Sequence, residues 1–390
     1  MKRPLFCNNN IKKVIMISVV EAITDTNVGG AGRLLLNRIK NSNNNEFKYT
    51  VLLPRGSALI PLLKDANIDF FEIDGAYDRS FDIKGCFEFY EALKMLKPDI
   101  INAHGALDAR IAGKFAGVAV KLYTRHCDFP TSGAYRLSLV KKLVSCGTDF
   151  LSDGIIAVSY SARDNLVRLG IDFKKINVII NGVEPIKGIS DNDKKILRSK
   201  LNIPTDAHVI SIFARLEKYK DHETFLLAAR ELLKSRDCYF LIVGSGSERE
   251  YLKSLAYKLK IFEKVRFLGF VKDVSPYMNI TDINVNCSIG TETSSLALSE
   301  GMSLGIPAIV SDYLGNTYMV HDGENGLIYH QRDYRSLAHK MDLLLGDENL
   351  YSILSDGAKK RYYKELNAKR MSRLTENYYL DMLKKKGYLT

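Results

Sequence analysis

Paired cysteines and metal-ligand spacings are missing from this chain of 390 residues. Its six cysteines are scattered, and none of them forms a C-x-x-C pair. Scattered thiols of this kind are usually reduced and buried, so the sequence predicts a cytoplasmic protein. The D-x-D motif of Asp191 and Asp193 falls in a segment that we expect to be a linker. We therefore interpret it as a solvated turn and predict no metal site.

Long hydrophobic runs are missing as well. The first apolar run, Val14–Val20, is too short to cross a membrane and lacks the cleavage site of a signal peptide, so we interpret it as a β-strand. The formal net charge of +11 favours an anionic partner. A concentrated basic arm and the aromatic signature of RNA-binding modules are absent, so the sequence does not indicate a nucleic-acid partner.

Two α/β domains are expected from the length of the chain and from the order of its segments. A chain of 390 residues exceeds the size of one typical hydrophobic core. Strand-like and helix-like segments alternate in both halves, which predicts two parallel sheets with helices on both faces. Residues 184–195 have the Pro, Gly, Ser and charge content of a linker. We therefore predict one domain over 1–185, joined by a C-terminal helix over 370–390, and a second domain over 186–369.

The expected strands are short apolar segments bounded by polar loops. In the first half they lie at 14–20, 49–54, 69–74, 98–105, 120–128, 154–159 and 176–183. In the second half they lie at 208–216, 239–247, 264–270, 282–288 and 308–310. The last helices are expected over 334–345 and 356–386.

The most informative stretch is Gly290–Asp312. The small polar run Thr293–Ser295 is typical of a helix N-terminus, and a buried strand, Ala308–Val310, follows the helix. Free backbone N–H groups at such a helix start can bind a diphosphate. Glu292 lies before the helix and Glu300 about two turns inside it, where both can accept hydrogen bonds from hydroxyls. The alternative is a capped amphipathic helix whose two acids face water.

The motifs together resemble retaining glycosyltransferases of family four (glycosyltransferases group 1), which have the GT-B fold of two Rossmann-like domains. The resemblance covers nearly the whole chain, including segments 159–184 and 322–341. In that family, two glutamates separated by seven residues flank the helix that binds the diphosphate, as Glu292 and Glu300 do. An Arg and a Lys five residues later hold the phosphates, which matches Arg215 and Lys220.

The resemblance implies a role for each matched residue in the second domain. Glu292 accepts hydrogen bonds from the donor sugar and offsets positive charge at its anomeric carbon, and Glu300 binds the ribose. Arg215 and Lys220 hold the diphosphate in place of a metal ion. They are assisted by the backbone N–H groups of four residues, Thr293, Ser294, Ser295 and Leu296. For the four charged residues the alternative is solvated surface charge.

Further matches carry implications of the same kind. Val271 presents its backbone to the nucleobase, and His126, at the end of an expected strand, faces the donor sugar. Gly29 and Gly30 belong to a glycine-rich loop near the phosphates and the acceptor; the alternative is a plain turn. For His126 the alternative is a structural histidine, and for His104 we favour that alternative.

Two departures from the family pattern limit the resemblance. Ser295 stands where the family often has glycine, and its side chain leaves less room for a ligand to approach the backbone N–H groups. Residues 313–320 lack the glutamate that many members carry, so no contact is carried over there.

The resemblance implies a retaining, metal-independent hexosyltransferase with no cofactor. It would move a sugar from a UDP-linked nucleotide sugar to an acceptor hydroxyl in envelope or surface polysaccharide biosynthesis. Two alternatives remain: a nucleotide-sugar epimerase of the same two-domain architecture, and a non-catalytic nucleotide-sugar-binding protein. Fold alone does not separate them.

Residues 110–142 predict peripheral contact with the inner face of the plasma membrane. The segment contains seven cations: Arg110, Lys114, Lys121, Arg125, Arg136, Lys141 and Lys142. Within it, apolar residues recur at helical spacing: Leu137, Val140, Leu143 and Val144. Such a helix can lie on an anionic bilayer, which would suit a lipid-linked or glycan acceptor. The alternative is a core-packing helix with solvated lysines.

Overall fold

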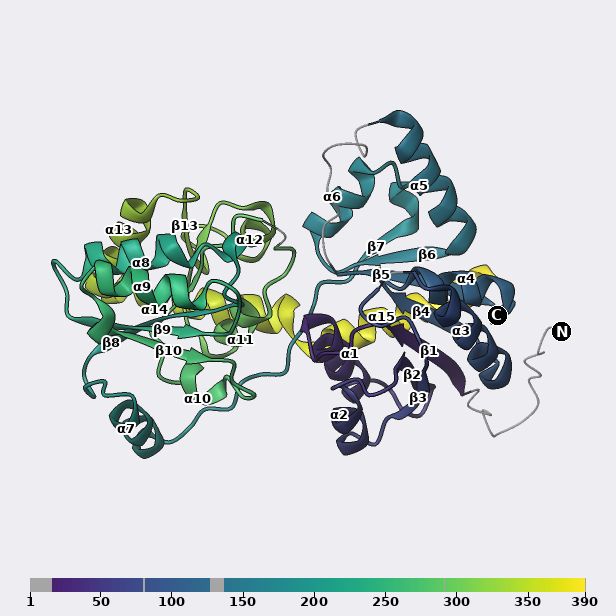
Figure 1. Cartoon of the computed structure of the whole chain (residues 1–390), viewed down its shortest axis with the longest axis horizontal. Coiled ribbons are helices and arrows are strands. Elements are labelled where there is room, and N and C mark those ends of the chain that lie inside the picture. The colour runs from purple at the N-terminus through teal and green to yellow at the C-terminus, as the bar shows by residue number, and fades with distance from the viewer. Residues whose placement is uncertain (1–15, 80, 127–136, 291, 390) are drawn as a thin grey trace. The chain divides into compact units, whose positions relative to one another are not determined.

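The computed structural model describes residues 16–79, 81–126, 137–290 and 292–389 (Figure 1). It divides into an N-terminal unit, Met1–Gly182 with Ala368–Thr390, and a C-terminal unit, Val183–Asn367. Each unit contains one parallel sheet flanked by helices. The predicted α/β class, with two Rossmann-like sheets, is confirmed.

In the described residues, the sheet of the N-terminal unit has the strand order β3-β2-β1-β4-β5-β6-β7. Its strands are β1 (Ile17–Ile23), β2 (Phe47–Pro54), β3 (Asp69–Ile73), β4 (Ile100–His104), β5 (Val120–Arg125), β6 (Gly154–Ala157) and β7 (Ile176–Val178). The helices are α1 (Gly30–Lys40), α2 (Ile60–Asp65), α3 (Ile83–Leu96), α4 (Leu107–Phe115), α5 (Ser138–Leu151), α6 (Tyr160–Arg168) and α15 (Ala368–Lys385). The order reverses direction between β1 and β4, and ligands of such sheets bind beside the carboxyl ends of the strands at this point.

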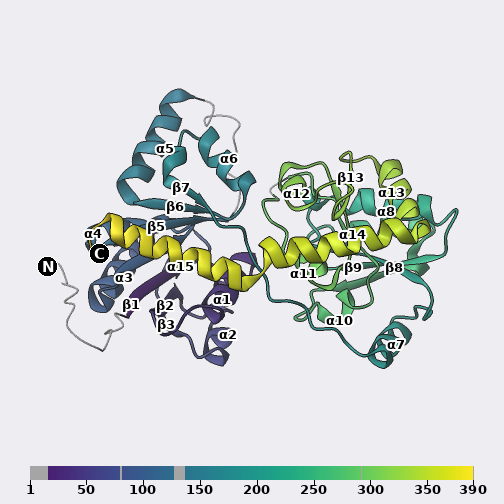
Figure 2. The ribbon, with the colours of Figure 1, turned by 180° about the vertical axis from the view of Figure 1, so that it is seen from behind.

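Strand periodicity decides what each face of this sheet contains. Side chains alternate along a strand, so Val20 and Ala22 of β1 point to one face and Glu21 to the other. Val20 and Ala22 pack in a core with residues of α3 and α4. The opposite face is covered by α1 and α15, which contact each other, and Figure 2 shows α15 lying along this sheet. Glu21 therefore points into a layer between the sheet and two helices.

In the described residues, the sheet of the C-terminal unit has the order β10-β9-β8-β11-β12-β13. Its strands are β8 (His208–Phe213), β9 (Cys238–Val243), β10 (Val265–Gly269), β11 (Ile283–Asn286), β12 (Ala308–Ser311) and β13 (Gly326–Tyr329). The helices are α7 (Asp191–Lys200), α8 (His222–Leu232), α9 (Arg249–Lys258), α10 (Ser275–Met278), α11 (Leu296–Leu304), α12 (Leu314–Met319), α13 (Tyr334–Gly346) and α14 (Glu348–Arg361).

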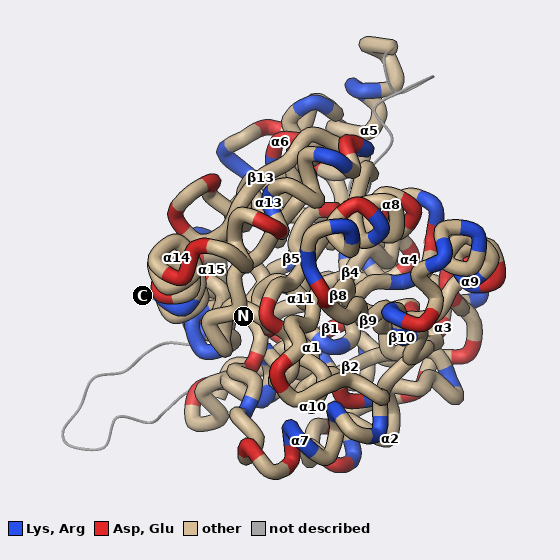
Figure 3. The backbone as a smooth tube through the Cα atoms, turned by 90° about the vertical axis from the view of Figure 1, so that its left-hand side faces the viewer, with Lys and Arg blue, Asp and Glu red and all other residues tan. Residues whose placement is uncertain are grey.

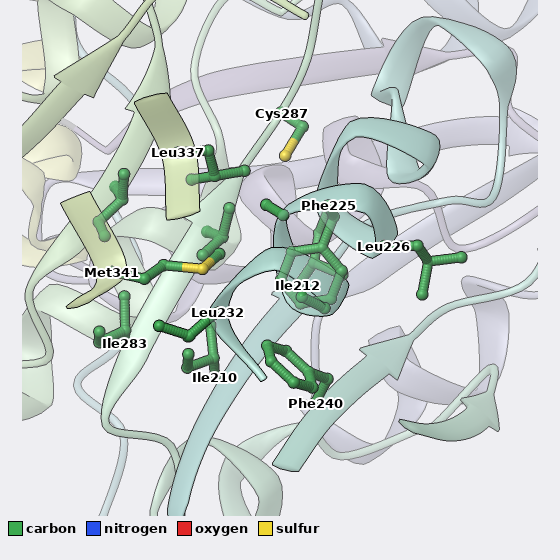
Figure 4. Close-up of a cluster of buried hydrophobic side chains, with 14 of the residues drawn as sticks. Ile210, Ile212, Phe225, Leu226, Leu232, Phe240, Ile283, Cys287, Leu337 and Met341 are labelled. Carbon is green, nitrogen blue, oxygen red and sulfur yellow. The ribbon is translucent and has the colours of Figure 1, made fainter. Parts of the chain in front are cut away.

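The core of this unit lies between the sheet and helices α8 and α13 (Figure 4). Ile210 and Ile212 of β8 pack there with Phe225 and Met341, and all four are at most 1% exposed. Fully burying such a side chain contributes about 1.5–3 kcal/mol, so the cluster fixes β8 and the loop that follows it. On the surface, α7, α8 and α9 each carry both acidic and basic residues (Figure 3).

Two expectations about helices are wrong. The expected linker contains the start of α7, where the Ser190 side chain accepts a hydrogen bond from the Asp193 backbone at 3.1 Å. The D-x-D motif is thus the first turn of a helix, where acids are favourable, and not a solvated turn. The single helix expected over 356–386 is also interrupted. A π-helical turn, Tyr362–Leu366, follows α14, and the extended residue Asn367 precedes α15.

Candidate functional site

Several loops of the C-terminal unit leave the carboxyl edge of its sheet and contact one another closely. Three glycines make this approach possible. A Cβ on Gly244 would lie 2.0 Å from the carbonyl oxygen of Ala214, and one on Gly246 would lie 2.3 Å from that of Leu216. A Cβ on Gly315 would lie 1.8 Å from the carbonyl oxygen of Glu292. The loops after β8, β9 and β11 and the start of α12 therefore form one packed unit.

Glu292 lies in this packed region and is only 7% exposed. Its Oε2 accepts hydrogen bonds from Lys220 Nζ at 2.5 Å, Ser288 Oγ at 3.1 Å and Asn286 Nδ2 at 3.3 Å. Lys220 comes from the loop after β8. The other residues come from the end of β11 and the segment after it, so the sheet order places them beside Lys220. The fold thus brings together two predicted site residues that are 72 positions apart.

Arg215 lies on the same loop as Lys220 and is exposed. Its guanidinium lies 5.9 Å from the centre of the Tyr219 ring, and the Lys220 ammonium lies 5.4 Å from it. Cations at this range interact favourably with the ring, which therefore holds two positive charges at one place.

Helix α11 begins directly after Glu292 and the three small polar residues. The Ser295 side chain caps it by accepting a hydrogen bond from the backbone N–H of Leu298 at 3.4 Å. The Ser294 hydroxyl is buried and has no hydrogen-bond partner among the described residues. Glu300 lies one turn into the helix and not two as expected, because the helix begins only at Leu296, and it is half-buried. Val271, also half-buried, follows β10, which pairs with β9.

The other predicted residues lie in the N-terminal unit. Gly29 and Gly30 are exposed at the start of α1, which has no side-chain cap. An anion can approach the backbone of such a helix start closely. Asp25 lies beside this turn, because a Cβ on Gly29 would be 3.7 Å from its Oδ2. Burial raises the pKa of Asp25, and the charge of Asp78 adds to this effect.

His104 and His126 lie together, one at the end of β4 and the other directly after β5. His104 Nδ1 is 2.7 Å from His126 Nε2, and the two rings are stacked with centroids 5.0 Å apart. His104 Nε2 also lies 2.7 Å from Oε2 of the fully buried Glu21. Burial, with the charges of Arg125 and Arg38 nearby, holds the pKa of His126 well below its ordinary value.

Glu21 was not predicted to belong to this group. The signal was present, because Glu21 is a charged residue within a strand that is mostly apolar. Polar residues also alternate at the ends of the two neighbouring strands, as Asn102 and His104 on one and Thr124 and His126 on the other. Period-two alternation places these side chains on the same face of the sheet.

The expected basic surface over residues 110–142 is partly wrong. Arg110 lies 4.4 Å over the Tyr123 ring and donates a hydrogen bond to Ser152 Oγ at 3.1 Å. Arg125 is only 7% exposed, and Lys121 forms an ion pair with Asp153 at 2.9 Å. These three cations are held by the sheet and its neighbours and do not face a membrane. Arg136 lies outside the described residues.

The apolar face of α5 also differs from the expectation. Leu137 and Leu143 are exposed, whereas Val140 and Val144 are half-buried. In the described part of the chain, no helix combines the length and the apolar character needed to cross a membrane. The same residues contain no group of three or more His, Cys, Asp or Glu placed to hold a metal ion.

Comparison with known protein families matches both halves of the chain. The family described as glycosyl transferases group 1 matches residues 193–361, and that described as glycosyltransferase family 4 matches residues 28–187. The UDP-Gal:alpha-D-GlcNAc-diphosphoundecaprenol alpha-1,3-galactosyltransferase of Escherichia coli is 25% identical over 372 residues, which cover 91% of this chain and 95% of that protein.

A second relative and a solved structure agree with this assignment. The O-antigen biosynthesis glycosyltransferase WclY of Escherichia coli is 30% identical over 258 residues, covering 64% of this chain and 70% of WclY. The crystal structure of Anabaena Alr3699/HepE in complex with UDP and glucose matches the fold with a TM-score of 0.78 at 19% identity, covering 92% of this chain and 98% of that one. The chain has the GT-B fold and belongs to the family of group 1 glycosyl transferases.

Proposed function

We propose that this protein transfers a hexose from a UDP-sugar to an acceptor hydroxyl and retains the anomeric configuration. The observation that carries the proposal is the pairing of Lys220 with the buried Glu292 at the start of α11. This arrangement places a cation, a carboxylate and the N-terminal end of a helix at the carboxyl edge of one sheet. A nucleoside diphosphate linked to a sugar needs these three kinds of group.

The diphosphate is proposed to bind at the start of α11. Arg215 and Lys220 supply positive charge, and the backbone N–H groups of residues 293–296 donate hydrogen bonds, with the buried Ser294 hydroxyl as a further donor. The Ser295 N–H donates to Met319 Sδ at 3.0 Å in the structure and is proposed to turn to a phosphate oxygen when the donor binds. In the structure described here, Lys220 is bound to Glu292. Donor binding then redirects part of its charge to a phosphate oxygen. Each charge-assisted hydrogen bond of this kind contributes about 1.5–3 kcal/mol.

The remaining roles follow the family resemblance and are proposals for this chain. Glu300 binds the ribose, and the backbone of Val271 contacts the base. Gly29, Gly30 and His126 belong to the domain proposed to bind the acceptor, over 1–185 and 370–390, with His126 directed at the donor sugar. The domain over 186–369 is proposed to bind the donor.

Transfer is proposed to occur by attack on the face that the diphosphate leaves. The acceptor oxygen bonds to the anomeric carbon, the bond from that carbon to the phosphate oxygen breaks, and the acceptor proton passes to the departing phosphate. Glu292 stabilises positive charge that develops on the sugar. Arg215, Lys220 and the helix N–H groups stabilise the leaving diphosphate, which is the role that a metal ion has in other transferases.

An envelope or surface glycan is the proposed acceptor, in a cytoplasmic reaction. The supporting relatives act in O-antigen biosynthesis and on a diphosphoundecaprenol-linked sugar, as their names state. Because these relatives are transferases, the epimerase and the non-catalytic binding protein are not favoured.

We also propose that α5 contacts an anionic membrane. Leu139, Leu143 and Phe150 are 67%, 64% and 57% exposed, and their spacing places them on one side of the helix. Lys142 is exposed beside them, and the Lys114 ammonium lies 4.5 Å from the centre of the Phe150 ring. Each cation near an anionic bilayer contributes about 1 kcal/mol.

Vesicle co-sedimentation tests the membrane proposal. Binding should rise with anionic lipid, fall with salt and be lost in the double variant Leu139→Ser, Leu143→Ser. The control is Ile353→Ser, which replaces a similarly exposed residue of α14 and should leave binding unchanged. Equal recovery of the wild type with neutral and anionic vesicles would contradict the proposal.

Turnover with a panel of nucleotide sugars tests the main proposal. A UDP-sugar should be consumed only when an acceptor such as a diphosphoprenyl-linked sugar is present, and activity should persist in excess EDTA. The product should show the same anomeric configuration as the donor in its proton coupling constant. An inverted product, conversion of the donor alone into an epimer, or activity that requires added Mg²⁺ or Mn²⁺ would each contradict part of the proposal.

A further inference from the structure

A chain of buried polar groups crosses the sheet of the N-terminal unit on the face covered by α1 and α15. It links Glu21 on β1, His104 at the end of β4 and His126 after β5 through two contacts of 2.7 Å. Glu21 is 0% exposed and His104 is 8% exposed. Strand order explains the line, because β1, β4 and β5 are consecutive neighbours in the sheet.

The Glu21 carboxylate is fully occupied by donors. Its Oε1 receives a hydrogen bond from Tyr379 at 2.8 Å and lies 2.5 Å from the Arg38 guanidinium. Its Oε2 receives hydrogen bonds from His104 at 2.7 Å and from Asn102 at 3.0 Å. Burial alone would raise the pKa of Glu21, but the charge of Arg38 and the hydrogen bonds from His104 and Tyr379 hold it below its ordinary value. The group is therefore an ionised carboxylate that can only accept.

This carboxylate determines where the hydrogens of the two histidines lie. Since Glu21 can only accept, His104 Nε2 must carry a hydrogen. The 2.7 Å contact between His104 Nδ1 and His126 Nε2 also needs one hydrogen. When His104 is neutral, its Nδ1 is an acceptor, so the hydrogen is on His126 Nε2. His126 Nδ1 is then the acceptor nitrogen of that ring.

A small cavity beside these groups does not accommodate a sugar. It has a volume of about 30 Å³ and is lined in part by Arg38, Asn102, His104, Thr124 and His126. This volume suits about one or two water molecules. Glu21 and His104 therefore act behind His126 and do not themselves contact a substrate in this cavity.

The C-terminal helix α15 completes the arrangement. Tyr379 is 0% exposed and reaches Glu21 from this helix. One turn and two turns earlier, Glu376 accepts a hydrogen bond from the backbone of Asn43 at 2.7 Å, and Ser372 Oγ donates one to the carbonyl oxygen of Arg38 at 2.5 Å. Residues near the end of the chain thus hold the Glu21 environment in place, as the course of α15 in Figure 2 shows.

We propose that His104 is neutral and that Glu21, His104 and Tyr379 are positioning residues that hold His126 as a neutral imidazole with its hydrogen on Nε2. The catalytic consequence rests on the proposed function, in which His126 is directed at the donor sugar. A neutral ring of fixed tautomer keeps one hydrogen-bonded orientation beside the proposed sugar site, whereas a ring whose hydrogen exchanges between the two nitrogens does not. The tautomer itself does not depend on the proposed function.

Several charged groups lie around these polar groups and affect the titration of the two histidines and Glu21. His126 faces the cations Arg125 of β5 and Arg38 of α1. His104 faces Glu21, and Asp25 in the loop after β1 is a further acid near it. Tyr49 of β2 and Tyr379 of α15 complete the surroundings of Glu21 and Arg38, and burial keeps both phenols protonated by raising their pKa.

Two variants interrupt this chain of buried polar groups at different points, and a third provides the control. His104→Gln places an amide where Nε2 contacts Glu21 but removes the nitrogen that contacts His126. Tyr379→Phe removes one hydroxyl from Glu21 and keeps the ring, so it should fold even if His104→Gln does not. Tyr378→Phe removes a similarly buried hydroxyl of the same helix that lies beside Gly154 and not beside Glu21.

Long-range ¹H–¹⁵N NMR of histidine-labelled protein measures the tautomer directly. The chain has seven histidines, and the His126→Gln variant identifies the His126 signals. At pH 7 the wild type should show His126 neutral and protonated on Nε2. The Nδ1-protonated form should appear in His104→Gln and, to a smaller extent, in Tyr379→Phe, but not in Tyr378→Phe. A wild-type His126 protonated on Nδ1, or unchanged His126 signals in both His104→Gln and Tyr379→Phe, would overturn the proposal.

Kinetics test the catalytic consequence separately. His104→Gln should lower kcat about 10–100-fold with little change in the donor KM, because it disturbs the orientation of a group and not the phosphate site. Tyr378→Phe should keep the wild-type kcat. Wild-type kcat in His104→Gln would overturn the positioning role. The expected NMR pattern in a protein without transferase activity would instead support the tautomer assignment and contradict the proposed function.

Discussion

Replacing Gly315 with alanine should damage the candidate donor site without touching a charged residue. Gly315 lies in the first turn of α12, where alanine would ordinarily stabilise the helix by about 0.5–1 kcal/mol. Here the new Cβ would lie 1.8 Å from the carbonyl oxygen of Glu292, and real Cβ contacts are essentially never closer than 3.0 Å. The backbone at Glu292 must therefore move by at least 1.2 Å, the difference between these two distances.

This displacement has consequences for stability and for activity. Forcing extra atoms into a packed region costs about 1–3 kcal/mol, so Gly315→Ala should lower the free energy of unfolding by that amount. A 1 Å displacement of a catalytic group costs about 100-fold in rate, so kcat should fall by about that factor. Gly188→Ala is the control, because its Cβ would meet its nearest neighbour only at 4.0 Å.

Urea unfolding and steady-state transfer kinetics measure the two effects. If Gly315→Ala is as stable as the wild type and keeps its kcat, the close contact between α12 and Glu292 does not exist in the protein.

Four further predictions concern single groups. Arg215→Ala and Lys220→Ala should each weaken UDP binding by about 10–150-fold, whereas Lys218→Ala in the same loop should not. If calorimetry shows wild-type UDP affinity in both Arg215→Ala and Lys220→Ala, these residues do not bind the diphosphate. Burial raises the pKa of Asp108 to about 7, so the native state keeps its proton longer than the unfolded chain and stability falls as pH rises from about 4 to 7. Asp108→Asn should therefore be about 1–3 kcal/mol more stable than the wild type at pH 8 and equal to it near pH 4, measured by urea unfolding at both pH values. Burial lowers the pKa of His222 to about 3, so the unfolded chain binds a proton at this residue at a higher pH than the native state does. The free energy of unfolding should therefore fall by up to about 1.4 kcal/mol for each unit by which the pH is lowered from 6.5 to 3. His222→Asn should flatten that slope, and an unchanged slope would contradict the burial of a neutral imidazole.

Strand periodicity and glycine placement predicted much of the fold. The apolar segments near 49–54, 100–104 and 308–310 are strands because they are buried on both faces, and this burial is visible in the sequence as a short apolar run. Helix α7 was missed for the opposite reason. Its residues are highly charged and none is buried, so no apolar stripe marks it.

The parts of the site that periodicity could not predict depend on contacts between distant segments. Glu21, His104 and Tyr379 meet because strand order places β1 beside β4 and because α15 returns to the N-terminal unit. Neither fact is encoded in local spacing. The charge of Arg110 and Arg125 predicted a surface position for both, whereas packing against Tyr123 and neighbouring segments half-buries Arg110 and buries Arg125.

More of the candidate donor site could be predicted from the sequence. Glu292, Ser295 and Glu300 lie on one continuous segment whose cap and helix can be predicted from residue types. The ion pair of Glu292 with Lys220 was not predicted, because it requires the loops after β8 and β11 to be neighbours.

The Glu292→Gln variant provides the most direct test of the central claim. The amide keeps the size of the side chain but removes the charge proposed to stabilise the transferring sugar, and it frees Lys220 for the diphosphate. Single-turnover transfer at saturating UDP-sugar should therefore fall by about 100-fold or more, while UDP affinity stays the same or rises. Wild-type transfer rates in this variant would show that Glu292 is a structural acid of the loop and that the site of transfer lies elsewhere.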